Sequence, residues 1–350
     1  MPEDSETVVS FRDDWVTAYE HSRRCEPFLN ALHLSLIEIG NLLQAPKRKW
    51  FQKNQIERDY FDSGEHWFLT DVKKRIYLPS KQVQDMQSKI LNYLCFGRNY
   101  RREYLRPSLY ATAYVPGRSG IILNAEIHKQ SKSSLHLDLH NAFEQIRTKH
   151  IYRYLKKQKA VLTPAFNDSA AWLFARLLSY QGKLRKGALA SPTIFNLLMT
   201  DFDNFLQNQL SKYNVKYSRY GDDFCFSSEV KSFPPELEQQ IISWIVNPTN
   251  LKSSTNGFDL NKYSFPALRL NFKKITRGSN GVLPLPGTVI IDGVILPKRD
   301  WMESLSTKIW CLNEHQFTGS RGFLLQFPKA SRRLMKKRFP ELEPLLYTSG

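Results

Sequence analysis

The sequence predicts an α+β protein, in which helices and strands follow one another in no regular order. Two segments carry this prediction. Residues 191–210, "SPTIFNLLMTDFDNFLQNQL", place apolar side chains at helical spacing after a proline in the first turn, where a helix tolerates it. Residues 215–228, "VKYSRYGDDFCFSS", read as two strands around Gly221, Asp222 and Asp223, which predicts a β-hairpin with these residues at its tip.

The N-terminal half begins with a region, residues 1–60, that we expect to be mostly helical, because residues 26–43 have apolar side chains at helical spacing. Residues 66–70 and 74–79 are strand-like and flank a short polar turn, which predicts a hairpin. The other elements expected in this half are an amphipathic helix at 83–95, a strand from 133 that turns into a helix at about 144–157, and a helix at 168–181.

The C-terminal half is expected to contain a helix at 235–246 and a second hairpin at 286–296. Residues 247–264 between them are polar and rich in turn-forming residues, so we expect an exposed loop. The remainder is predicted to be helical and ends in the basic run "KASRRLMKKRFPE".

Composition narrows the class of partner. Hydrophobic residues make up 41% of the chain, enough for a packed core, and 50 basic against 33 acidic residues give a net charge of +17. A chain this basic is typical of proteins that bind a polyanion, here nucleic acid. The sequence contains no apolar run of about 18 residues, so we expect no membrane span. The acidic N-terminus lacks the apolar core of a signal peptide. Four scattered cysteines favour the reduced cytoplasm and argue against a zinc site.

The adjacent carboxylates Asp222 and Asp223 cost free energy in a half-buried segment unless something compensates them. Enzymes that join nucleotides hold two Mg²⁺ ions about 4 Å apart with carboxylates, because Mg²⁺ prefers hard oxygen ligands. Asp138 ends the strand-like "LHLD", so a neighbouring strand end would bring it beside the hairpin tip. Bound metal would then compensate the clustered charge. The alternative is a pair of solvated turn residues.

At this point the sequence resembles the bacterial retron-like reverse transcriptases, across roughly residues 66–340. "YGDD" (220–223) resembles the family's Tyr-x-Asp-Asp motif. The other matching segments, in order, are "KRIYLPSKQVQDMQSKIL" (74–91), "AYVPGRSGIILNAEIH" (113–128) with its Asn-Ala-x-x-His, "LHLDLHNAFEQI" (135–146), "GALASPTIFNLLMTDFD" (187–203) and "LRLNFKKIT" (268–276).

The resemblance implies a right-hand polymerase fold, with the catalytic carboxylates on a palm sheet. The N-terminal helical extension and the fingers would occupy residues 1–130, interleaved with the start of the palm. The palm, with elements of the fingers, would cover 131–297, and a basic helical thumb 298–350.

The resemblance also implies roles for single residues. The metal ligands would be Asp138, Leu139, Asp222 and Asp223, holding two Mg²⁺ ions for which Mn²⁺ can substitute, with Asp223 contributing less directly than the other two aspartates. Lys274 matches the lysine that protonates the leaving pyrophosphate, which is general acid catalysis. Its neighbour Lys273 is the alternative.

Nucleotide contacts are implied next. Phe143 would lie under the sugar of the incoming nucleotide and exclude a 2′-hydroxyl, unless it is a core aromatic. The residues expected to bind the substrate are Lys74, Arg75, Arg118, Phe143, Lys186 and Gly187. Lys186 departs from the family, because "LRKGALASP" has a lysine where Pro-Gln-Gly would place glutamine. "LPGTVII" (285–291) likewise replaces the Val-Thr-Gly of retron enzymes.

The residues expected to contact nucleic acid are Asn124, His128, Arg332, Arg333, Lys336, Lys337 and Arg338. For Asn124 and His128 the alternative is that they fix the chain. The basic run belongs to a thumb candidate at 321–346, and its positive charge suits contact with the backbone of a duplex or structured RNA. The alternative for this run is a solvated helix face.

The function expected from the resemblance is that of an RNA-directed DNA polymerase, a nucleotidyltransferase that uses deoxynucleoside triphosphates and a structured non-coding RNA as template or scaffold. Its product would be DNA or an RNA–DNA duplex. It would act in antiphage defence in the bacterial cytoplasm, and an effector protein would be a further partner. Two alternatives stay open: a template-independent or protein-primed deoxynucleotide polymerase, and a non-enzymatic RNA-binding module with the same fold.

Overall fold

The structure is a computed structural model, and it describes residues 15–36, 38–39, 67–71, 76–96, 104–117, 120–162, 165–247 and 268–347. The chain divides into two compact units. The first comprises Met1–Pro107, Asn141–Met199 and Asp259–Pro266, and the second Ser108–His140, Thr200–Phe258 and Ala267–Gly350. The long helix α10 (Ser191–Leu210) contributes residues to both units.

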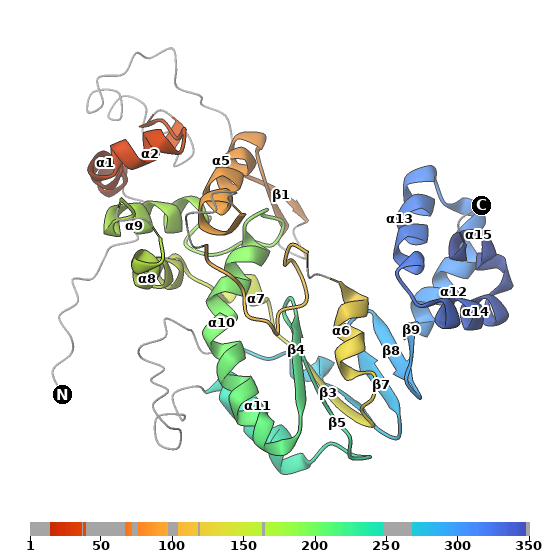
Figure 1. The fold of residues 1–350 in the computed structure, drawn as a ribbon. Coiled ribbons are helices and arrows are strands. Elements are labelled where there is room, and N and C mark those ends of the chain that lie inside the picture. The colour runs from red at the N-terminus through yellow and green to blue at the C-terminus, as the bar shows by residue number, and fades with distance from the viewer. Residues whose placement is uncertain are drawn as a thin grey trace. The chain divides into compact units, whose positions relative to one another are not determined.

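The first unit contains helices and one small sheet (Figure 1). Strands β1 (Trp67–Asp71) and β2 (Ile76–Pro79) pair antiparallel, which confirms the expected hairpin. The helices are α1 (Trp15–Arg24), α2 (Glu26–Ala31), α5 (Lys81–Leu91) with a π-helical turn (Asn92–Phe96), α7 (Ala142–Gln145), α8 (Thr148–Lys157), a 3₁₀ turn (Gln158–Ala160) and α9 (Asp168–Leu177).

The core of the first unit forms around α9. Helix α9 begins after Asn167, whose side chain accepts a hydrogen bond from the backbone N–H of Ala170, and it buries Trp172 and Phe174. Phe174 contacts the rings of Phe28 and Phe166 at centroid distances of 5.9 and 5.6 Å. These contacts join α2 and the segment before α9 into one aromatic cluster.

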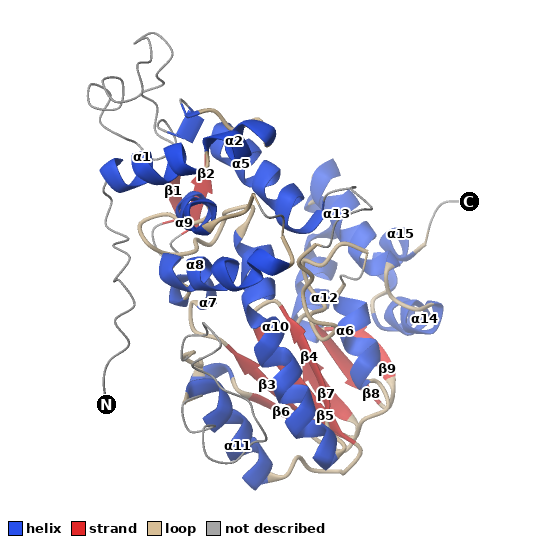
Figure 2. Ribbon diagram, turned by 60° about the vertical axis from the view of Figure 1, so that its left-hand side comes forward, coloured by secondary structure: helices blue, strands red, loops and turns tan. Residues whose placement is uncertain are grey.

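The second unit is built on a four-stranded antiparallel sheet in the order β4-β5-β3-β6, which Figure 2 shows in red. The strands are β3 (Ser133–Asp138), β4 (Lys216–Tyr220), β5 (Asp223–Ser228) and β6 (Thr276–Gly278). The predicted hairpin at 215–228 is confirmed by the β4–β5 pairing, and its turn connects Tyr220 with Asp223, which already pairs as the first residue of β5.

Alternation along the strands gives this sheet two different faces. Leu135, Leu137, Phe224 and Phe226 share one face, where Phe202 of α10 meets Phe224 edge-on. Helix α11 (Pro235–Val246) covers the same side through the ring contact of its Trp244 with Phe205 of α10. Ser134, His136, Asp138, Ser218 and Cys225 share the other face. Helix α6 (Ile121–His128), which contacts Ser218 and Cys225, packs on that side.

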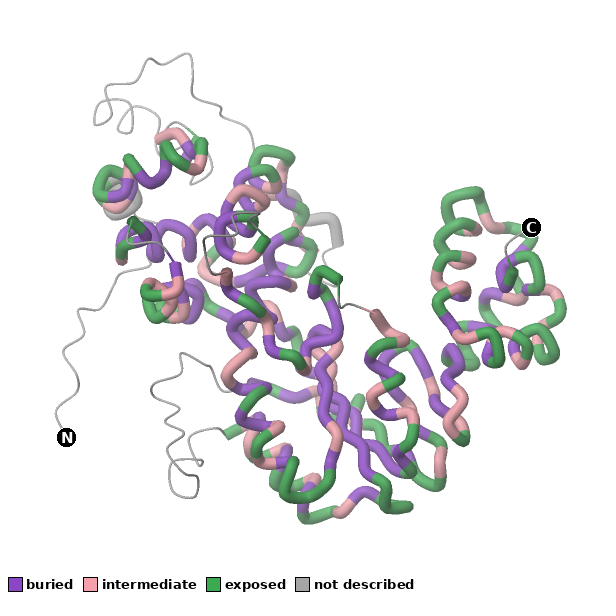
Figure 3. The backbone as a smooth tube through the Cα atoms, in the orientation of Figure 1, coloured by how far each residue is buried: buried purple, intermediate pink, exposed green. Residues whose placement is uncertain are grey.

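A second, three-stranded sheet connects the four-stranded sheet to the C-terminal helices. Its strands are β7 (Val282–Leu285), β8 (Thr288–Ile291) and β9 (Val294–Pro297). The helices after it are α12 (Arg299–Lys308), α13 (Glu314–Leu325), α14 (Lys329–Arg338) and α15 (Glu343–Leu346), with 3₁₀ turns at Ile309–Cys311 and Pro340–Leu342. Leu283, Ile290, Phe327, Met335 and Leu345 are buried in one cluster, so these elements form a single core. Figure 3 marks the buried residues of the chain in purple.

Several element predictions are confirmed and some are corrected. Helices at 191–210 and 235–246 have the predicted bounds, and the second hairpin at 286–296 is the β8–β9 pair. The single helix expected at 144–157 is instead two, because the backbone is extended at Ile146 and Arg147. The helix expected at 168–181 ends at Leu177, and strand β7 was not predicted.

Other predictions are left open. The loop expected at 247–264 lies outside the described residues except for residue 247, as does much of the helical region expected at 1–60. The boundaries of fingers, palm and thumb at 130/131 and 297/298 stay a prediction. No helix in the described part of the chain is both long enough and apolar enough to cross a membrane.

Candidate active site

The turn between β4 and β5 places two carboxylates at one end of the four-stranded sheet. Gly221 has φ +65°, a left-handed conformation that glycine adopts without steric cost. The backbone N–H of Leu139 donates to the carbonyl oxygen of Asp222 at 3.2 Å. The turn is therefore tied to the residue that follows Asp138, so all three predicted aspartates lie at the same sheet end.

Asp138 and Asp223 lie directly opposite each other on the neighbouring strands β3 and β5. Like charges at opposed positions of a sheet destabilise it. Two cationic or polar groups compensate: Nζ of Lys274 donates to Oδ1 of Asp138 at 3.1 Å, and Nε2 of His136 lies 2.7 Å from Oδ1 of Asp223. His136 was not predicted from the sequence. Its position two residues before Asp138, on the same sheet face, is the signal that could have found it.

A buried ion pair stands behind the turn. The guanidinium of Arg219 donates to both carboxylate oxygens of Asp203, at 2.9 and 2.8 Å, and its Nη1 donates to the carbonyl oxygen of Gly221 at 2.8 Å. Both side chains are fully buried. Tyr217 and Ser108 donate to the same carboxylate at 2.7 and 2.5 Å.

This network holds the backbone of the β4–β5 turn to α10. Burial lowers the pKa of Arg219, but the stronger combined effect of Asp203 and Tyr217 raises it above its usual value, so the guanidinium stays charged. A buried charge with satisfied hydrogen bonds is costly to break, because the remaining partner would be left unpaired. This pair was not predicted from the sequence. A charged residue inside each of two otherwise buried segments is the signal for it.

Tyr114 is a further residue beside the turn. Its backbone has φ +57°, which is uncommon for a large side chain, and 54% of the residue is exposed. A Cβ added at Gly221 would lie 3.4 Å from its ring. Burial and the charges of Asp222 and Asp223 raise the pKa of the Tyr114 phenol, so it stays protonated at neutral pH.

Asn124 and His128 are fully buried under the sheet, which contradicts the expectation that they contact nucleic acid. The two ring nitrogens of His128 lie 2.7 Å from the hydroxyls of Ser227 and Ser218. Oδ1 of Asn124 accepts from Thr112 and Ser218 at 2.9 and 2.7 Å. Burial, assisted by the charge of Lys216, lowers the pKa of His128 to about 3, so the ring is neutral. These contacts join α6 to the sheet and agree with the alternative, that the two residues fix the chain.

The candidates for nucleotide binding that the structure describes lie in the first unit. Phe143 is half-buried and meets Phe195 edge-on at 5.6 Å. Lys186 has an exposed side chain, and its carbonyl oxygen accepts from the N–H of Tyr77 at 2.9 Å. Gly187 has φ +98°, and a Cβ there would lie 2.7 Å from the carbonyl oxygen of Tyr77. Only glycine therefore fits this close approach of the chain to β2.

Arg185, which was not predicted from the sequence, stabilises this close approach of residues 186–187 to β2. It is buried, with its guanidinium 4.6 Å from the centre of the Tyr77 ring. The remaining substrate candidates, Lys74, Arg75 and Arg118, lie outside the described residues.

The basic residues of α14 fall into two groups. Arg332 donates to the carbonyl oxygen of Leu346 at 2.9 Å, and Lys336 forms an ion pair with Glu343, so both hold the C-terminal segment against α14. The other three are exposed: Arg333, Lys337 and Arg338. The expectation of nucleic acid contact stays a prediction for all five, and for these exposed three no contact within the protein competes with it among the interactions the structure describes.

The donor chemistry of the carboxylate cluster fits divalent cations. Asp138, Asp222 and Asp223 supply hard oxygen ligands at one sheet end. Among the described residues, however, no group of three or more His, Cys, Asp or Glu side chains is arranged closely enough to hold a metal ion. Lys274 and His136 occupy carboxylate oxygens instead. Reverse transcriptases as a class use divalent metal ions.

Comparison with known proteins identifies the family. The model of the reverse transcriptase (RNA-dependent DNA polymerase) family matches residues 70–254. The retron Ec83 reverse transcriptase of Escherichia coli is 30% identical over 230 residues, which are 63% of this chain and 71% of that protein. The retron Ec86 reverse transcriptase of Escherichia coli is 22% identical over 156 residues, 45% of this chain and 44% of that protein.

Solved structures with similarity include two yeast telomerases. Telomerase from Candida albicans, in complex with a fragment of telomeric RNA, gives a TM-score of 0.40 at 12% identity, over 87% of this chain and 50% of that chain. Apo telomerase from Candida tropicalis gives 0.38 at 13% identity, over 76% and 48%. The chain thus spans about half the length of each telomerase. From the family match and the retron relatives together, the chain belongs to the reverse transcriptase family and is a retron-like RNA-directed DNA polymerase with the right-hand fold.

Proposed function

We propose that this chain copies a structured non-coding RNA into DNA, at the sheet end that carries Asp138, Asp222 and Asp223. The observation that carries the proposal is the cross-strand pairing of Asp138 with Asp223, with Asp222 in the adjoining turn and Lys274 on Asp138. A cluster of like charges costs stability, so its presence at a sheet end favours a role in binding cations and phosphates.

Two Mg²⁺ ions, for which Mn²⁺ can substitute, would be held by Asp138 and Asp222, with Leu139 and Asp223 as further ligands. When bound, such ions activate the attacking 3′-hydroxyl and neutralise the triphosphate. His136 orients the Asp223 carboxylate through its 2.7 Å contact, which supports a less direct role for Asp223. Arg219 holds Gly221 and so positions the turn that carries both aspartates.

Lys274 would donate a proton from Nζ to the leaving pyrophosphate as a general acid. Its contact with Asp138 supports Lys274 over Lys273, because the carboxylate places the ammonium beside the reacting phosphates. The Lys274 side chain is 64% exposed, so it can turn from Asp138 to a substrate.

The incoming deoxynucleotide would be held by Phe143 under its sugar and by Lys186 and Gly187. Lys74, Arg75 and Arg118 are proposed to contact its triphosphate or the template. The exposed residues of α14 would contact the template–product duplex, since basic side chains neutralise backbone phosphates.

A second function is favoured by one residue. Lys186 stands where the family has a glutamine, and an added cation beside the nucleotide suits binding of phosphate rather than reading of a template base. The second candidate is therefore deoxynucleotide addition without copying, or from a protein primer. The third, a non-enzymatic RNA-binding module, would give no physical reason for the clustered carboxylates.

The proposed setting follows from the retron relatives. The chain would work in the bacterial cytoplasm, in antiphage defence, with its structured RNA and an effector protein as partners. The products would be DNA or an RNA–DNA duplex.

The test is DNA synthesis by the purified chain with its co-purified RNA, Mg²⁺ and labelled deoxynucleotides, followed by sequencing of the product. Asp222→Ala/Asp223→Ala is the inactive comparison, and Glu229→Gln, an exposed carboxylate just after β5, is the matched control. A product complementary to the RNA, absent only in the double variant, supports copying. A homopolymer or random product supports the second candidate, and no product from a folded, RNA-loaded chain supports the third.

A further inference from the structure

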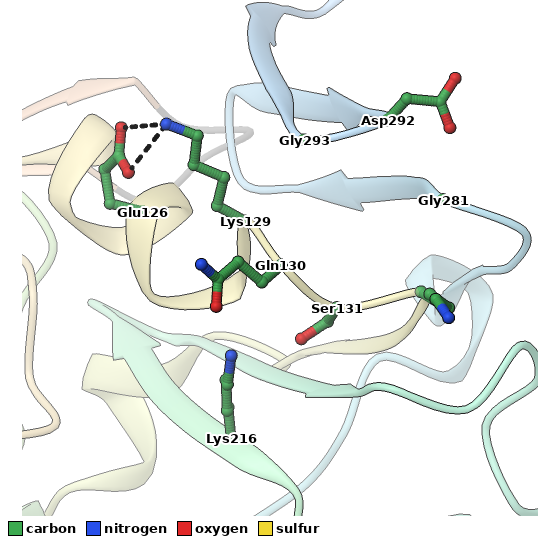
Figure 4. A pocket seen from close by; sticks show the side chains of 9 residues that line it. Glu126, Lys129, Gln130, Ser131, Lys216, Gly281, Asp292 and Gly293 are labelled. Carbon is green, nitrogen blue, oxygen red and sulfur yellow. Dashed lines mark hydrogen bonds and ion pairs between the residues drawn. The ribbon is translucent and has the colours of Figure 1, made fainter.

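The end of the four-stranded sheet opposite the carboxylates opens onto a cavity of about 710 Å³. Three lysines line it: Lys129 and Lys132 lie in the short segment between α6 and β3, and Lys216 begins β4. Two acidic residues, Glu126 and Asp292, lie at its margin (Figure 4). None of the described residues assigned to nucleotide or metal binding above lines this cavity.

The register of the strands brings the lysines together. The N–H of Lys132 donates to the carbonyl oxygen of Ser228 at 2.8 Å, and Lys216 pairs with Ser227, so both flank the end of β5. Strand alternation places Lys216 on the face of Ser218, which is the face that α6 covers. Figure 4 shows Lys216 pointing from its strand toward Gln130.

The positive charge in the cavity is incompletely compensated. Nζ of Lys129 lies 3.4 Å from Glu126, with both side chains about 40% exposed, a kind of pair that contributes little. Lys132 and Lys216 make no ion pair within the part of the chain that the structure describes. The charge of Lys216 also helps to keep the buried ring of His128 neutral. An anion would therefore be attracted here.

The shape of the cavity suits a nucleic acid backbone rather than a base. Two glycines with positive φ, Gly281 and Gly293, form its turns, and a Cβ at Gly281 would lie 2.7 Å from Oδ1 of Asp292. The described residues that line the cavity include no aromatic side chain, so they offer no platform on which a base could stack.

We propose that this cavity binds the phosphodiester backbone of the RNA on which the enzyme acts, at a point distant from the catalytic carboxylates. The inference rests on the proposed function for the identity of the polymer. Lys132 and Lys216 would contact phosphate oxygens. Glu126 and Asp292 can accept a hydrogen bond from a 2′-hydroxyl, a donor that DNA lacks, while they repel a phosphate placed too near. The combination favours RNA over DNA.

The cavity and the catalytic end are electrically separate. Six residue steps along β3 lead from Lys132 to Asp138, a distance of about 20 Å at the usual strand rise of about 3.3 Å. The Debye length at physiological salt is about 8 Å. Changing the charge of the lysines therefore leaves the field at the carboxylates nearly unaltered, which makes the two ends separable by mutation.

The experiment measures binding of a synthetic RNA hairpin with single-stranded tails, and of the DNA with the same sequence, at several salt concentrations. Lys132→Gln/Lys216→Gln is the test variant. Lys149→Gln/Lys212→Gln, which neutralises two exposed lysines elsewhere, is the matched control. Thermal unfolding of each variant establishes that it is folded.

The expected result is RNA affinity at least about tenfold lower for the test variant, and a salt dependence less steep by about 1.4, since each lost phosphate contact on a single strand contributes about 0.7. In DNA synthesis the loss falls on the KM for the RNA template. The control variant keeps the affinity and slope of the unaltered chain. Equal affinity and slope for test and control variants would overturn the proposal, as would displacement of the loss onto the KM for deoxynucleotides.

A second variant, Asp292→Asn, tests the preference for RNA. It keeps the lysines but replaces the charged carboxylate with a neutral amide, whose oxygen is a weaker acceptor, so the ratio of RNA to DNA affinity falls while DNA binding rises or stays the same. An unchanged ratio contradicts the role assigned to Asp292.

Failure of the two proposals is distinguishable. If the chain makes no DNA but its RNA binding depends on Lys132 and Lys216, the cavity proposal is supported and the polymerase proposal is contradicted. If the chain copies RNA but its RNA affinity does not depend on these lysines, the polymerase proposal is supported and the cavity proposal is contradicted.

Discussion

At one end of the sheet β4-β5-β3-β6, Asp138 and Asp223 face each other, whereas at the other end of the same face Lys132 and Lys216 flank the last residues of β5. At the acidic end, Lys274 forms an ion pair with Asp138, and the ring of His136 contacts Asp223. The basic end leaves two ammonium groups without an ion pair among the described residues.

What lies behind each end differs as well. Behind the acidic turn stands a fully buried charged pair, Arg219 with Asp203. Behind the basic end the buried groups are neutral: His128 with its two serine partners, and Ser131 with Ser227. The comparison indicates that whether a charged side chain is paired within the protein depends on how deeply it is buried. A buried charge must have its partner within the protein, while an exposed charge is available to a ligand.

The largest expected effect is at the acidic end. Asp138→Asn removes a charge but keeps the shape, so DNA synthesis falls by roughly 10³-fold or more, because the site can no longer hold cations against the substrate phosphates. Chelation of divalent metal gives the same loss in the unaltered chain. Primer extension measures both. Activity within tenfold of the unaltered chain would show that the sheet end is not the catalytic one.

The next effect is on stability. Asp203→Asn leaves the buried guanidinium of Arg219 without its counterion, so the free energy of unfolding falls by about 3–5 kcal/mol. Asp168→Asn is the matched control: its ion pair with Lys159 is almost half exposed and contributes at most about 1 kcal/mol. Chemical denaturation measures both. Equal losses would mean that the buried pair does no more than a surface pair.

The third effect separates two neighbouring lysines. Lys274→Gln is expected to lower the rate of nucleotide addition at saturating substrate by about 10²-fold, since it removes the proposed general acid, while Lys273→Gln leaves the rate nearly unchanged. Single-turnover kinetics gives the rates. A larger loss for Lys273→Gln would indicate that Lys273 is the proton donor. It would also show that contact with Asp138 does not identify the general acid.

The smallest effect lies at the basic end and depends on pH. The pKa of His128 is lowered to about 3 in the folded chain, against about 6.5 when unfolded. Between these values only the unfolded chain binds the proton, so stability is lost as pH falls below about 6.5, by about 1 kcal/mol at pH 5.5. His150, whose pKa burial lowers to about 4, acts in the same direction.

Denaturation curves at several pH values check this. The pH dependence becomes shallower in His128→Gln, and shallower still when His150→Gln is added. If His128→Gln keeps the full dependence, the buried ring is not the group that titrates.

Much of the fold could be predicted from local patterns. The helices at 191–210 and 235–246 and the hairpins around Gly221 and Asp292 depend on periodicity and turn residues, which are local in the chain. The break between α7 and α8 could not be predicted, because both segments suit a helix. There the extended residue Arg147 bridges to Lys183, a partner distant in sequence.

The position of the candidate site's acidic residues was also predictable, because Asp222 and Asp223 are contiguous and Asp138 could be placed beside them by reasoning about strand ends. The sequence alone determined which residues are acidic, basic or apolar and in what period. Tertiary structure decided which of them meet: that His128 and Asn124 are buried, that Arg219 pairs with Asp203, and that Lys132 and Lys216 line one cavity. Strand register and helix packing bring together residues far apart in the chain, and no local pattern encodes that pairing.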